Sequence, residues 1–440
     1  MSLVTPESIR QLQRKLYVAA KQEPKRRFHQ LYDKVYRADI LKHAYALAKS
    51  NSGAPGVDGV TFERIESEGL ENWLEGLRKE LHEKTYKASP VRRVMIAKIG
   101  GGERPLGIPT IRDRVAQSAA KLLLEPIFEA DFEASAYGYR PRRNAEDALR
   151  EVHRLLCQGY TEVVDADLSK YFDTIPHHEL KQSVARRIVD RQMLKLIKMW
   201  LKVAVEERDE GGKRHMTGGK GSKMGTPQGG VISPLLANIY MHRFLRAWRE
   251  GSKGGQYHAH IVNYADDFVI LSRDRAVQAL QWTRWAMGAI KLTLNESKTC
   301  IRNARQERFN FLGYSFGPER YRKDGHWYLA AQPSEKAIRQ AKEGVAAVLR
   351  PGNQDPWEEV VARLNRILRG WANYFRYGTR LGAYRAIDNY VYHRAADFLR
   401  RRHKVRQRCI RRFSDAAIFE DFKVQRLRAL HVGAPACATT

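Results

Sequence analysis

Residues 261–271 read Ile-Val-Asn-Tyr-Ala-Asp-Asp-Phe-Val-Ile-Leu, and this stretch constrains the fold more than any other part of the chain. Asp266 and Asp267 lie between two apolar, β-branched runs, a pattern that predicts two strands joined by a tight turn. Two adjacent carboxylates in a core repel each other and lose hydration, which costs several kcal/mol each without compensation. A divalent cation such as Mg²⁺, which prefers oxygen ligands, is the usual compensation. The alternative is a turn in which both acids face solvent.

A second apolar run also carries acids. Residues 161–175 contain Asp165 and Asp167, which are two positions apart and therefore share one face of a strand. If a sheet brings Asp167 beside the 266–267 turn, three carboxylates can surround one or two Mg²⁺ ions. Two ions about 3.5–4 Å apart are how polymerases activate a 3′-hydroxyl and stabilise the leaving pyrophosphate. The alternative is a chance pairing of two acidic strands.

Several segments of the chain resemble the motifs of reverse transcriptases, in the version found in group II intron-encoded reverse transcriptase/maturases of bacteria and organelles. In chain order, they are residues 53–59 (GAPGVDG), 104–110 (RPLGIPT) with Asp113-Arg114, 167–173 (DLSKYFD), 225–238 (GTPQGGVISPLLAN), 264–267 (YADD), 294–298 (LNESK) and 311–313 (FLG). The resemblance extends from about residue 40 to about residue 400. Any one block is weak evidence, but so many blocks in the expected order leave little room for coincidence.

The resemblance implies an α+β protein with the right-hand polymerase fold, in which fingers and palm with antiparallel sheet precede an all-helical thumb/maturase domain. It implies catalytic roles for Asp167, Asp266 and Asp267, which would hold two Mg²⁺ ions with the backbone carbonyl of Leu168 as an extra ligand. Asp165 and Asp173 are expected to be structural, and Asp173 to hydrogen-bond the segment that follows it.

The same resemblance suggests how a nucleotide would be held. Phe172 occupies the position of the aromatic residue that packs under the sugar and excludes a 2′-hydroxyl; the alternative is an ordinary core phenylalanine. Lys98 and Arg104 flank a glycine loop and would hold the triphosphate, unless they are merely solvated residues of a hairpin. Gln228 lies in a glycine-rich turn that lets the backbone approach the nucleotide, and Lys298 matches a lysine of a later palm motif.

Charge and composition agree with a nucleic-acid partner. The 440 residues carry a formal net charge of +29, which implies a polyanion, and aromatic residues are interleaved with the cations in a way that suits base stacking. An anionic membrane is the competing partner, but no apolar run approaches the roughly 18–20 residues of a spanning helix, and no signal peptide opens the chain. Together with the family that the chain resembles, this implies a bacterial cytoplasmic protein, associated with the nucleoid when it acts on DNA.

The four cysteines lie far apart, without a C-x-x-C pair, and the histidines lack the spacing of metal ligands. His177-His178 and the pair His258/His260 are expected to be solvated or structural. The pattern indicates a reduced chain without a zinc site, and without the endonuclease domain that many relatives of this family carry after the maturase region.

Turn residues and periodicity divide the chain into a basic helical extension (1–50), fingers and palm (51–330), a thumb/maturase domain (331–415) and a partly disordered tail (416–440). Within these parts, the pattern predicts helices over residues 5–48, a hairpin over 90–110, one helix over 179–206 and a loop over 211–225.

The C-terminal region pairs an apolar helix face with a basic one. The expected buried face is Val360, Val361, Leu364, Ile367, Leu368, Trp371, Tyr374 and Phe375. Beside it lies an arginine stripe of Arg366, Arg369 and Arg376, which Arg380 would continue beyond Gly378. A solvated charged face is the default for such a pattern, but almost no acids accompany this one, so we expect an RNA-binding surface. Residues 400–412 add eight Arg or Lys and no acid.

Two functions follow from these expectations and do not exclude each other. One is an RNA-directed DNA polymerase that uses deoxynucleoside triphosphates to copy intron RNA at a DNA target or primer. The other is a maturase that binds the intron RNA as a splicing cofactor and needs no live active site. A reverse transcriptase of a defence or diversity-generating system is the third possibility. Intact Asp167, Asp266 and Asp267 favour a live polymerase, and the arginine-rich C-terminal region favours the intron type.

Overall fold

The computed structural model describes residues 3–97, 103–209, 211, 213–321, 324–404 and 410–430. Two compact units make up the chain. Unit 1 comprises residues 1–148 and 164–301, and unit 2 comprises residues 149–163 and 302–440. The described helices include none that is long and apolar enough to cross a membrane.

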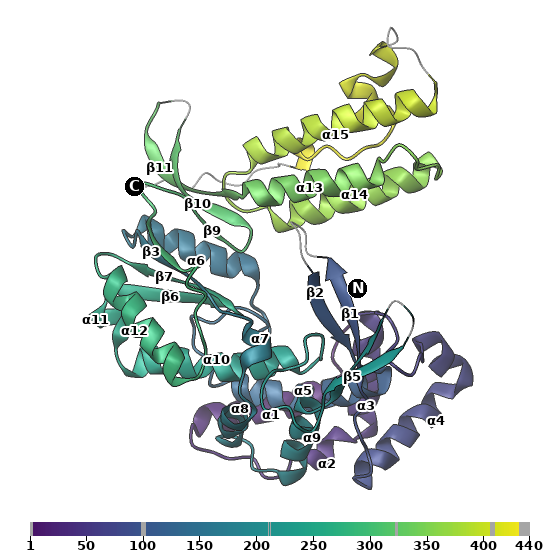
Figure 1. The fold of residues 1–440 in the computed structure, drawn as a ribbon, viewed down its shortest axis with the longest axis vertical. Helices are drawn as coiled ribbons and strands as arrows, with labels where there is room; N and C mark the ends of the chain where they lie inside the picture. The colour runs from purple at the N-terminus through teal and green to yellow at the C-terminus, as the bar shows by residue number, and fades with distance from the viewer. Residues whose placement is uncertain are drawn as a thin grey trace. The chain divides into compact units, whose positions relative to one another are not determined.

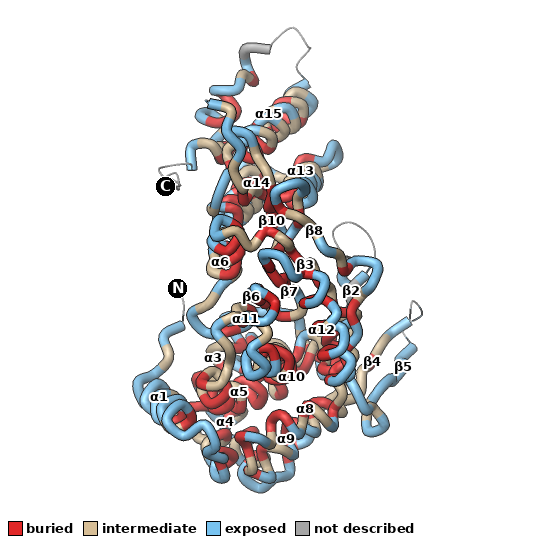
Figure 2. Tube along the Cα trace, turned by 90° about the vertical axis from the view of Figure 1, so that its left-hand side faces the viewer, coloured by how far each residue is buried: buried red, intermediate tan, exposed pale blue. Residues whose placement is uncertain are grey.

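Unit 1 begins with helices, as the sequence predicts for residues 5–48 (Figure 1). They are α1 (Glu7–Gln22), α2 (Tyr32–Val35), α3 (Ala38–Ser50) and α4 (Phe62–His82). The long helix α5 (Ile111–Glu129) packs against α1, α2 and α3 and is buried along most of its length, as Figure 2 shows. Its first turn is capped by Thr110, whose hydroxyl accepts a hydrogen bond from the Asp113 backbone N–H at 3.1 Å.

A four-stranded sheet in the order β2-β1-β4-β5 contains the predicted hairpin of residues 90–110. Strands β1 (Val91–Ala97) and β2 (Glu103–Ile108) are antiparallel, with Arg93 opposite Gly107. β1 pairs in parallel with β4 (Ala204–Arg208), which is antiparallel to β5 (Arg214–Gly218).

Two local predictions in this region were wrong. The expected single helix over 179–206 is two helices, α8 (His177–Ala185) and α9 (Arg191–Leu201), followed by β4. The break falls at Asp190, whose carboxylate accepts hydrogen bonds from the N-terminal backbone of α9 and from the backbone of Leu31 and Tyr32. The expected loop over 211–225 contains β5, because pairing with β4 gives its backbone hydrogen-bond partners.

The second four-stranded sheet has the order β6-β7-β3-β8. Its strands are β3 (Glu162–Asp167), β6 (Ala259–Tyr264), β7 (Asp267–Ser272) and β8 (Cys300–Asn303). Helices α11 (Lys253–Gln256) and α12 (Ala276–Ala289) pack against β6 and β7. The other helices of this part of the chain are α6 (Ala145–Cys157), α7 (Tyr171–Thr174) and α10 (Ser233–Glu250). Helix α10 is buried along one side and packs against α5, α8 and α12.

Unit 2 contains a three-stranded antiparallel sheet and a helical bundle with its own core. The strands, in the order β11-β10-β9, are β9 (Phe309–Phe311), β10 (Tyr314–Arg320) and β11 (Trp327–Pro333). The helices are α13 (Glu335–Val348), α14 (Trp357–Tyr374) and α15 (Leu381–Arg402), with short helical turns at 410–413, 417–421 and 428–430. This helical region matches the fold class expected from the sequence.

Candidate active site

Asp266 and Asp267 lie at the turn of a hairpin. β6 and β7 are antiparallel with Tyr264 opposite Asp267, so Ala265 and Asp266 form a two-residue turn. Ala265 has a φ of 59° and adopts the left-handed conformation that such turns require. β3 is the neighbour of β7, which puts the strand that ends at Asp167 beside the strand that begins at Asp267. The predicted hairpin and the predicted pairing of the two acidic strands are both confirmed.

The segment around Gly138, which is far away in the sequence, packs against this turn. A Cβ on Gly138 would lie 2.5 Å from the backbone nitrogen of Ala265, so only glycine allows this approach. The Gly138 carbonyl accepts a hydrogen bond from the Asn238 side chain at 2.8 Å. Asn263 is buried and donates its side-chain N–H to the Ala265 carbonyl at 2.9 Å, which fixes the turn from inside.

Asp267 carries the clearest electrostatic signature of the site. Loss of hydration, followed by the negative charges of Asp266, Asp167 and Asp165, raises the pKa of its carboxyl from 3.8 to about 6. The residue Asp267 is exposed to solvent at the surface. The protein atoms around its carboxylate nevertheless displace much of the water that would hydrate this group. Lys298 opposes the rise and does not cancel it. The site therefore has excess negative charge of the kind that a cation relieves.

Asp167 is held by the segment that follows α12. Its carboxylate lies 3.1 Å from the Lys298 ammonium and accepts a hydrogen bond from the Asn295 side chain, also at 3.1 Å. Its backbone carbonyl accepts the Asn295 N–H at 2.7 Å, and Leu168 forms a bridge with Leu294. Lys298, which the sequence predicts to contact a nucleotide, thus pairs here with a predicted metal ligand.

The acids fit a divalent cation in ligand type and in charge. Carboxylate oxygens are the donors that Mg²⁺ prefers. Loss of hydration and the neighbouring acids both raise the pKa of Asp267, and a cation would oppose both effects. The carboxylates are adjacent rather than convergent: among the described residues, no group of three His, Cys, Asp or Glu side chains is arranged closely enough to hold a metal ion.

Phe172 lies in α7, five residues after Asp167, and is buried. Its ring meets the rings of Tyr171 and Tyr139 edge-on, with centroids 5.6 and 6.5 Å away. Tyr171 donates its hydroxyl to the Ala237 carbonyl at 2.6 Å, which ties α7 to α10. Phe172 therefore belongs to the core of unit 1, and its role as a sugar gate stays a prediction.

Gln228 connects the motif around α7 to the fingers hairpin. Its side-chain amide donates to both carboxylate oxygens of Asp173 at 3.2 Å, and its carbonyl accepts the Gly107 N–H at 2.6 Å. A Cβ on Gly229 would lie 2.3 Å from the Gly107 carbonyl oxygen. The glycines thus let backbone pack on backbone. Asp173 accepts hydrogen bonds from Gln228, 55 positions later, whereas the sequence predicts a bond to the segment that directly follows Asp173.

The predicted triphosphate contacts have different outcomes. Arg104 lies in β2, opposite Ile96 in β1. Lys98 lies outside the described residues. The same is true of residues 405–409 and of 431–440, which include parts of the basic segment 400–412 and of the tail expected to be disordered.

The expected arginine stripe in unit 2 is partly present. Arg366 and Arg369 are exposed on α14, and Arg376 is exposed just after the helix ends at Tyr374. Arg380 departs from the expectation, because it is buried, donates to the Arg376 carbonyl and stacks over the Tyr384 ring. Tyr374, expected to be buried, is exposed at 46%, since its hydroxyl reaches out to the Leu312 carbonyl.

Several positioning residues escaped the sequence analysis. Gly138 and Asn295 act through contacts with distant segments, so no local pattern marks them, whereas Asn263 contacts the carbonyl of Ala265 two residues further on. Asn295 lies within the LNESK segment, three positions before Lys298. The one available signal was Asn263, a polar residue between the apolar run 261–262 and the acidic turn.

Comparison with known proteins defines the class of this fold. The family model for reverse transcriptase (RNA-dependent DNA polymerase) matches residues 96–316, which is 221 of the 440 residues. The family model for the group II intron, maturase-specific domain, matches residues 338–414. The chain belongs to the reverse transcriptase family, in the branch encoded by group II introns that carries a maturase-specific domain.

Individual relatives agree with this assignment. Protein YkfC of Escherichia coli (strain K12) is 35% identical over 366 residues, which cover 75% of this chain and 93% of YkfC. Group II intron-encoded protein LtrA of Lactococcus lactis subsp. cremoris is 37% identical over 218 residues, which cover 49% of this chain and 34% of LtrA. The aligned region thus spans only about a third of LtrA.

Proposed function

We propose that the protein is an RNA-directed DNA polymerase that copies group II intron RNA into DNA during retrohoming. The observation that carries the proposal is the acidic hairpin beside β3, where loss of hydration, together with three neighbouring acids, raises the pKa of Asp267 to about 6. A turn whose acids served only solubility would have no reason to be built over Gly138 and Asn263. The substrates would be deoxynucleoside triphosphates on a DNA primer, in the bacterial cytoplasm and at the nucleoid.

Asp167, Asp266 and Asp267 would hold the metal, with the Leu168 carbonyl as a further ligand. Two bound Mg²⁺ ions supply activation of the primer 3′-hydroxyl and stabilisation of the leaving pyrophosphate. Lys298, whose ammonium now lies 3.1 Å from the Asp167 carboxylate, would leave it when cations neutralise this carboxylate, and the ammonium would then be available to phosphate oxygens. Asn295 would keep the Asp167 side chain oriented throughout.

The nucleotide would lie between α7 and the fingers hairpin. Phe172 would bound the space beside the 2′ position of the sugar, and Gln228 would be kept in place by Asp173 and Gly107. Arg104 and Lys98 would contact the triphosphate from the hairpin, where guanidinium geometry suits phosphate oxygens.

Primer extension on an RNA template tests the polymerase directly. Asp266→Asn and Asp267→Asn should each abolish DNA synthesis, because a neutral amide does not offset the charge of the ions. Asp274→Asn is the matched control, since Asp274 follows β7 in the same hairpin and is exposed in a pair with His258. RNA binding should survive in all three variants. Extension at nearly the wild-type rate in either of the first two variants would overturn the metal assignment.

A maturase role is the second proposal, and the match of residues 338–414 to the maturase-specific domain favours it. Exposed Arg366, Arg369 and Arg376 would contact intron RNA phosphates. A protein used in defence or sequence diversification would lack such an RNA partner. An open reading frame inside a structured intron RNA supports the maturase role, and its absence from the flanking sequence would contradict it.

A further inference from the structure

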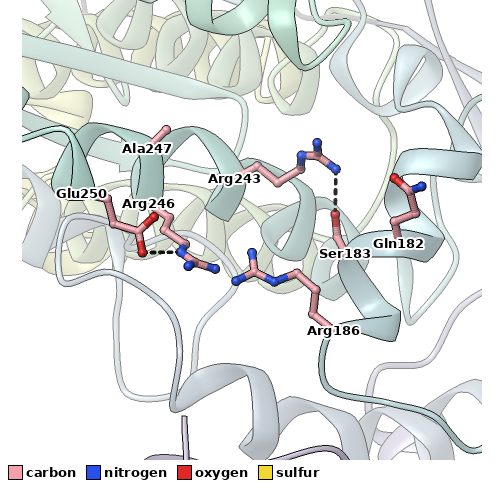
Figure 3. Close-up of a pocket in the computed structure, with 7 residues that line it drawn as sticks. All are labelled: Gln182, Ser183, Arg186, Arg243, Arg246, Ala247 and Glu250. Carbon is pink, nitrogen blue, oxygen red and sulfur yellow. Dashed lines mark hydrogen bonds and ion pairs between the residues drawn. The ribbon is translucent and has the colours of Figure 1, made fainter. Parts of the chain in front are cut away.

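A hollow lined by arginines lies on unit 1, between helices α8 and α10. Its volume is about 490 Å³, and Figure 3 shows the residues that line it, namely Gln182, Ser183, Arg186, Arg243, Arg246, Ala247 and Glu250. A second hollow of about 570 Å³ shares Arg186, Arg243 and Arg246 and extends to Lys25 and Arg27. None of the residues predicted to bind metal or nucleotide lines either hollow.

The positive charges of the first hollow exceed the negative ones. Arg246 pairs with Glu250 at 2.7 Å, and Arg243 donates to the Ser183 hydroxyl at 3.3 Å. The side chain of Arg186 has neither an ion pair nor a hydrogen bond to any described residue. In Figure 3 the guanidinium groups of Arg186 and Arg246 point toward one another. The lining of the first hollow therefore contains three guanidinium groups and one carboxylate, that of Glu250.

Solvated arginines at helix ends are the simpler explanation. Arg186 caps the C-terminus of α8, and Arg246 lies near the C-terminus of α10, where the helix dipole favours cations. The dipole explains why cations gather at these ends. It does not explain why Arg186 and Arg246 face each other across a hollow, since two guanidinium groups repel when no anion lies between them.

The shape and lining of the site indicate phosphate rather than protein. Guanidinium groups form paired hydrogen bonds with phosphate oxygens, and several of them at one site favour an anion with more than one acceptor. Ala247 is the one apolar residue among those that line the first hollow, so a protein partner would find little to anchor an apolar side chain. The second hollow has apolar residues in its lining, namely Phe128, Phe132 and Ile239, but it adds Lys25 and Arg27 to the cations, and such a row of cations suits a chain of successive phosphates.

We propose that this arginine pocket, defined by Arg186, Arg243 and Arg246, binds backbone phosphates of RNA. It is a contact separate from the acidic hairpin and from the arginine stripe of α14. The identity of the partner as RNA rests on the proposed function, whereas the chemistry of the site rests on the pocket itself.

The test compares salt dependence of binding to a fluorescent hairpin RNA of about 20 base pairs. Arg186→Gln combined with Arg243→Gln and Arg246→Gln should lower the slope of log affinity against log salt by about two to three, because each lost phosphate contact removes about 0.9. The control replaces Arg10, Arg64 and Arg78, which each pair with a glutamate on α1 or α4, and so removes the same net charge. This control should change the slope by less than one.

Arg186→Gln alone guards against a folding defect, because Arg186 is exposed and its side chain makes no bond that the fold needs. It should keep the melting temperature and lower the slope by about one. A wild-type slope in both the single and the triple variant would overturn the proposal.

Calorimetry with tripolyphosphate separates the two sources of phosphate. If the triple variant loses tripolyphosphate binding but keeps the wild-type RNA slope, the site takes free polyphosphate, and the RNA assignment is wrong. Primer extension on a short, saturating primer–template is measured in parallel. An inactive wild-type protein would refute the polymerase without touching the RNA contact, because the binding assay needs no DNA synthesis.

Discussion

Asp267 shows how one residue can be poorly suited to the isolated fold and well suited to a bound cation. Its carboxyl loses hydration and faces three other acids, so ionisation is unfavourable within the folded chain. In the unfolded chain the same carboxyl ionises near its ordinary pKa of 3.8. Between these two values the folded state holds the proton more tightly, so stability falls as the pH rises from about 4 to about 6.

Asp267→Asn should therefore raise the melting temperature of the metal-free protein at pH 7.5, by about 1–3 °C after allowance for solvent screening. The gain should shrink as the pH is lowered toward 4, because the carboxyl of the folded wild type is then protonated and as neutral as the amide. Thermal denaturation with a chelator present measures the difference, and Asp274→Asn provides the comparison. A variant that is less stable than the wild type at pH 7.5 would contradict the electrostatic account.

Phe172→Ala should increase the ratio of ribonucleotide to deoxyribonucleotide incorporation, because it opens the space beside the sugar. The ring is buried, so the same change costs about 3–5 kcal/mol of stability. Phe172→Val removes less volume and should show the altered ratio at a smaller cost. Competitive incorporation assays on folded protein measure the ratio. An unchanged ratio in both variants would make Phe172 a core residue only.

The exposed arginines of α14 and the turn that follows it act as a surface rather than as single contacts. Arg366, Arg369 and Arg376 are exposed, whereas Arg380 lies inside unit 2 against Tyr384. The helix ends at Tyr374, so Arg376 and Arg380 do not follow its periodicity. Burial, and not sequence spacing, separates Arg380 from the three exposed arginines.

Neutralising Arg366, Arg369 and Arg376 together should reduce the salt slope of intron RNA binding by about three. Splicing assistance should fall with it, while synthesis on a short, saturating primer–template should fall less. Arg380→Gln is the contrasting variant, which should lower the melting temperature and leave the slope unchanged. Binding assays over a salt series distinguish these results. A triple variant with the wild-type slope would make the stripe a solvated face.

The turn that carries Gln228 depends on close backbone packing against β2. Gly229 has a φ of 107°, and a Cβ there would lie 2.3 Å from the Gly107 carbonyl oxygen. Gly229→Ala should cost about 2–4 kcal/mol and raise the KM for deoxynucleotides. Gly221→Ala is the matched control, since a Cβ at Gly221 meets nothing within 4 Å. Thermal denaturation and steady-state kinetics measure both effects; equal behaviour of the two variants would refute the packing argument.

At the scale of the whole chain, the two units do not follow the order of the sequence. Residues 149–163, which include nine of the 13 residues of α6, belong to unit 2 together with residues 302–440. His153 shows the reason, because its ring nitrogens contact the Tyr377 hydroxyl at 2.7 Å and the Leu329 carbonyl at 2.9 Å. An early helix thus completes a unit whose other elements come much later.

His153→Phe should destabilise unit 2 by about 1–3 kcal/mol, since it keeps a ring but leaves the Leu329 carbonyl and the Tyr377 hydroxyl without this partner. His393→Phe is the control, because His393 is exposed on α15 in the same unit. Thermal denaturation monitored together with RNA binding measures the effect. Equal melting temperatures for the two variants would show that α6 is not needed by unit 2.

Much of the polymerase fold could be predicted because its signals are local. The alternation of apolar residues around Asp266 and Asp267 predicts a hairpin, and a glycine-centred turn at 100–102 predicts the pair β1 and β2. Helical periodicity after Pro333 predicts the C-terminal bundle. Each signal involves neighbours within one or two elements, so backbone geometry and burial pattern are sufficient.

The remaining features depend on groups that are distant in sequence. Asp190 ends a helical pattern because it also caps the backbone at Leu31 and Tyr32, and β5 forms because β4 is beside it. Lys298 pairs with Asp167, 131 positions away, and Gly138 admits the Ala265 turn. Periodicity carries no information about such partners, since hydrogen bonds, ion pairs and close contacts depend on which segments the folded chain brings together.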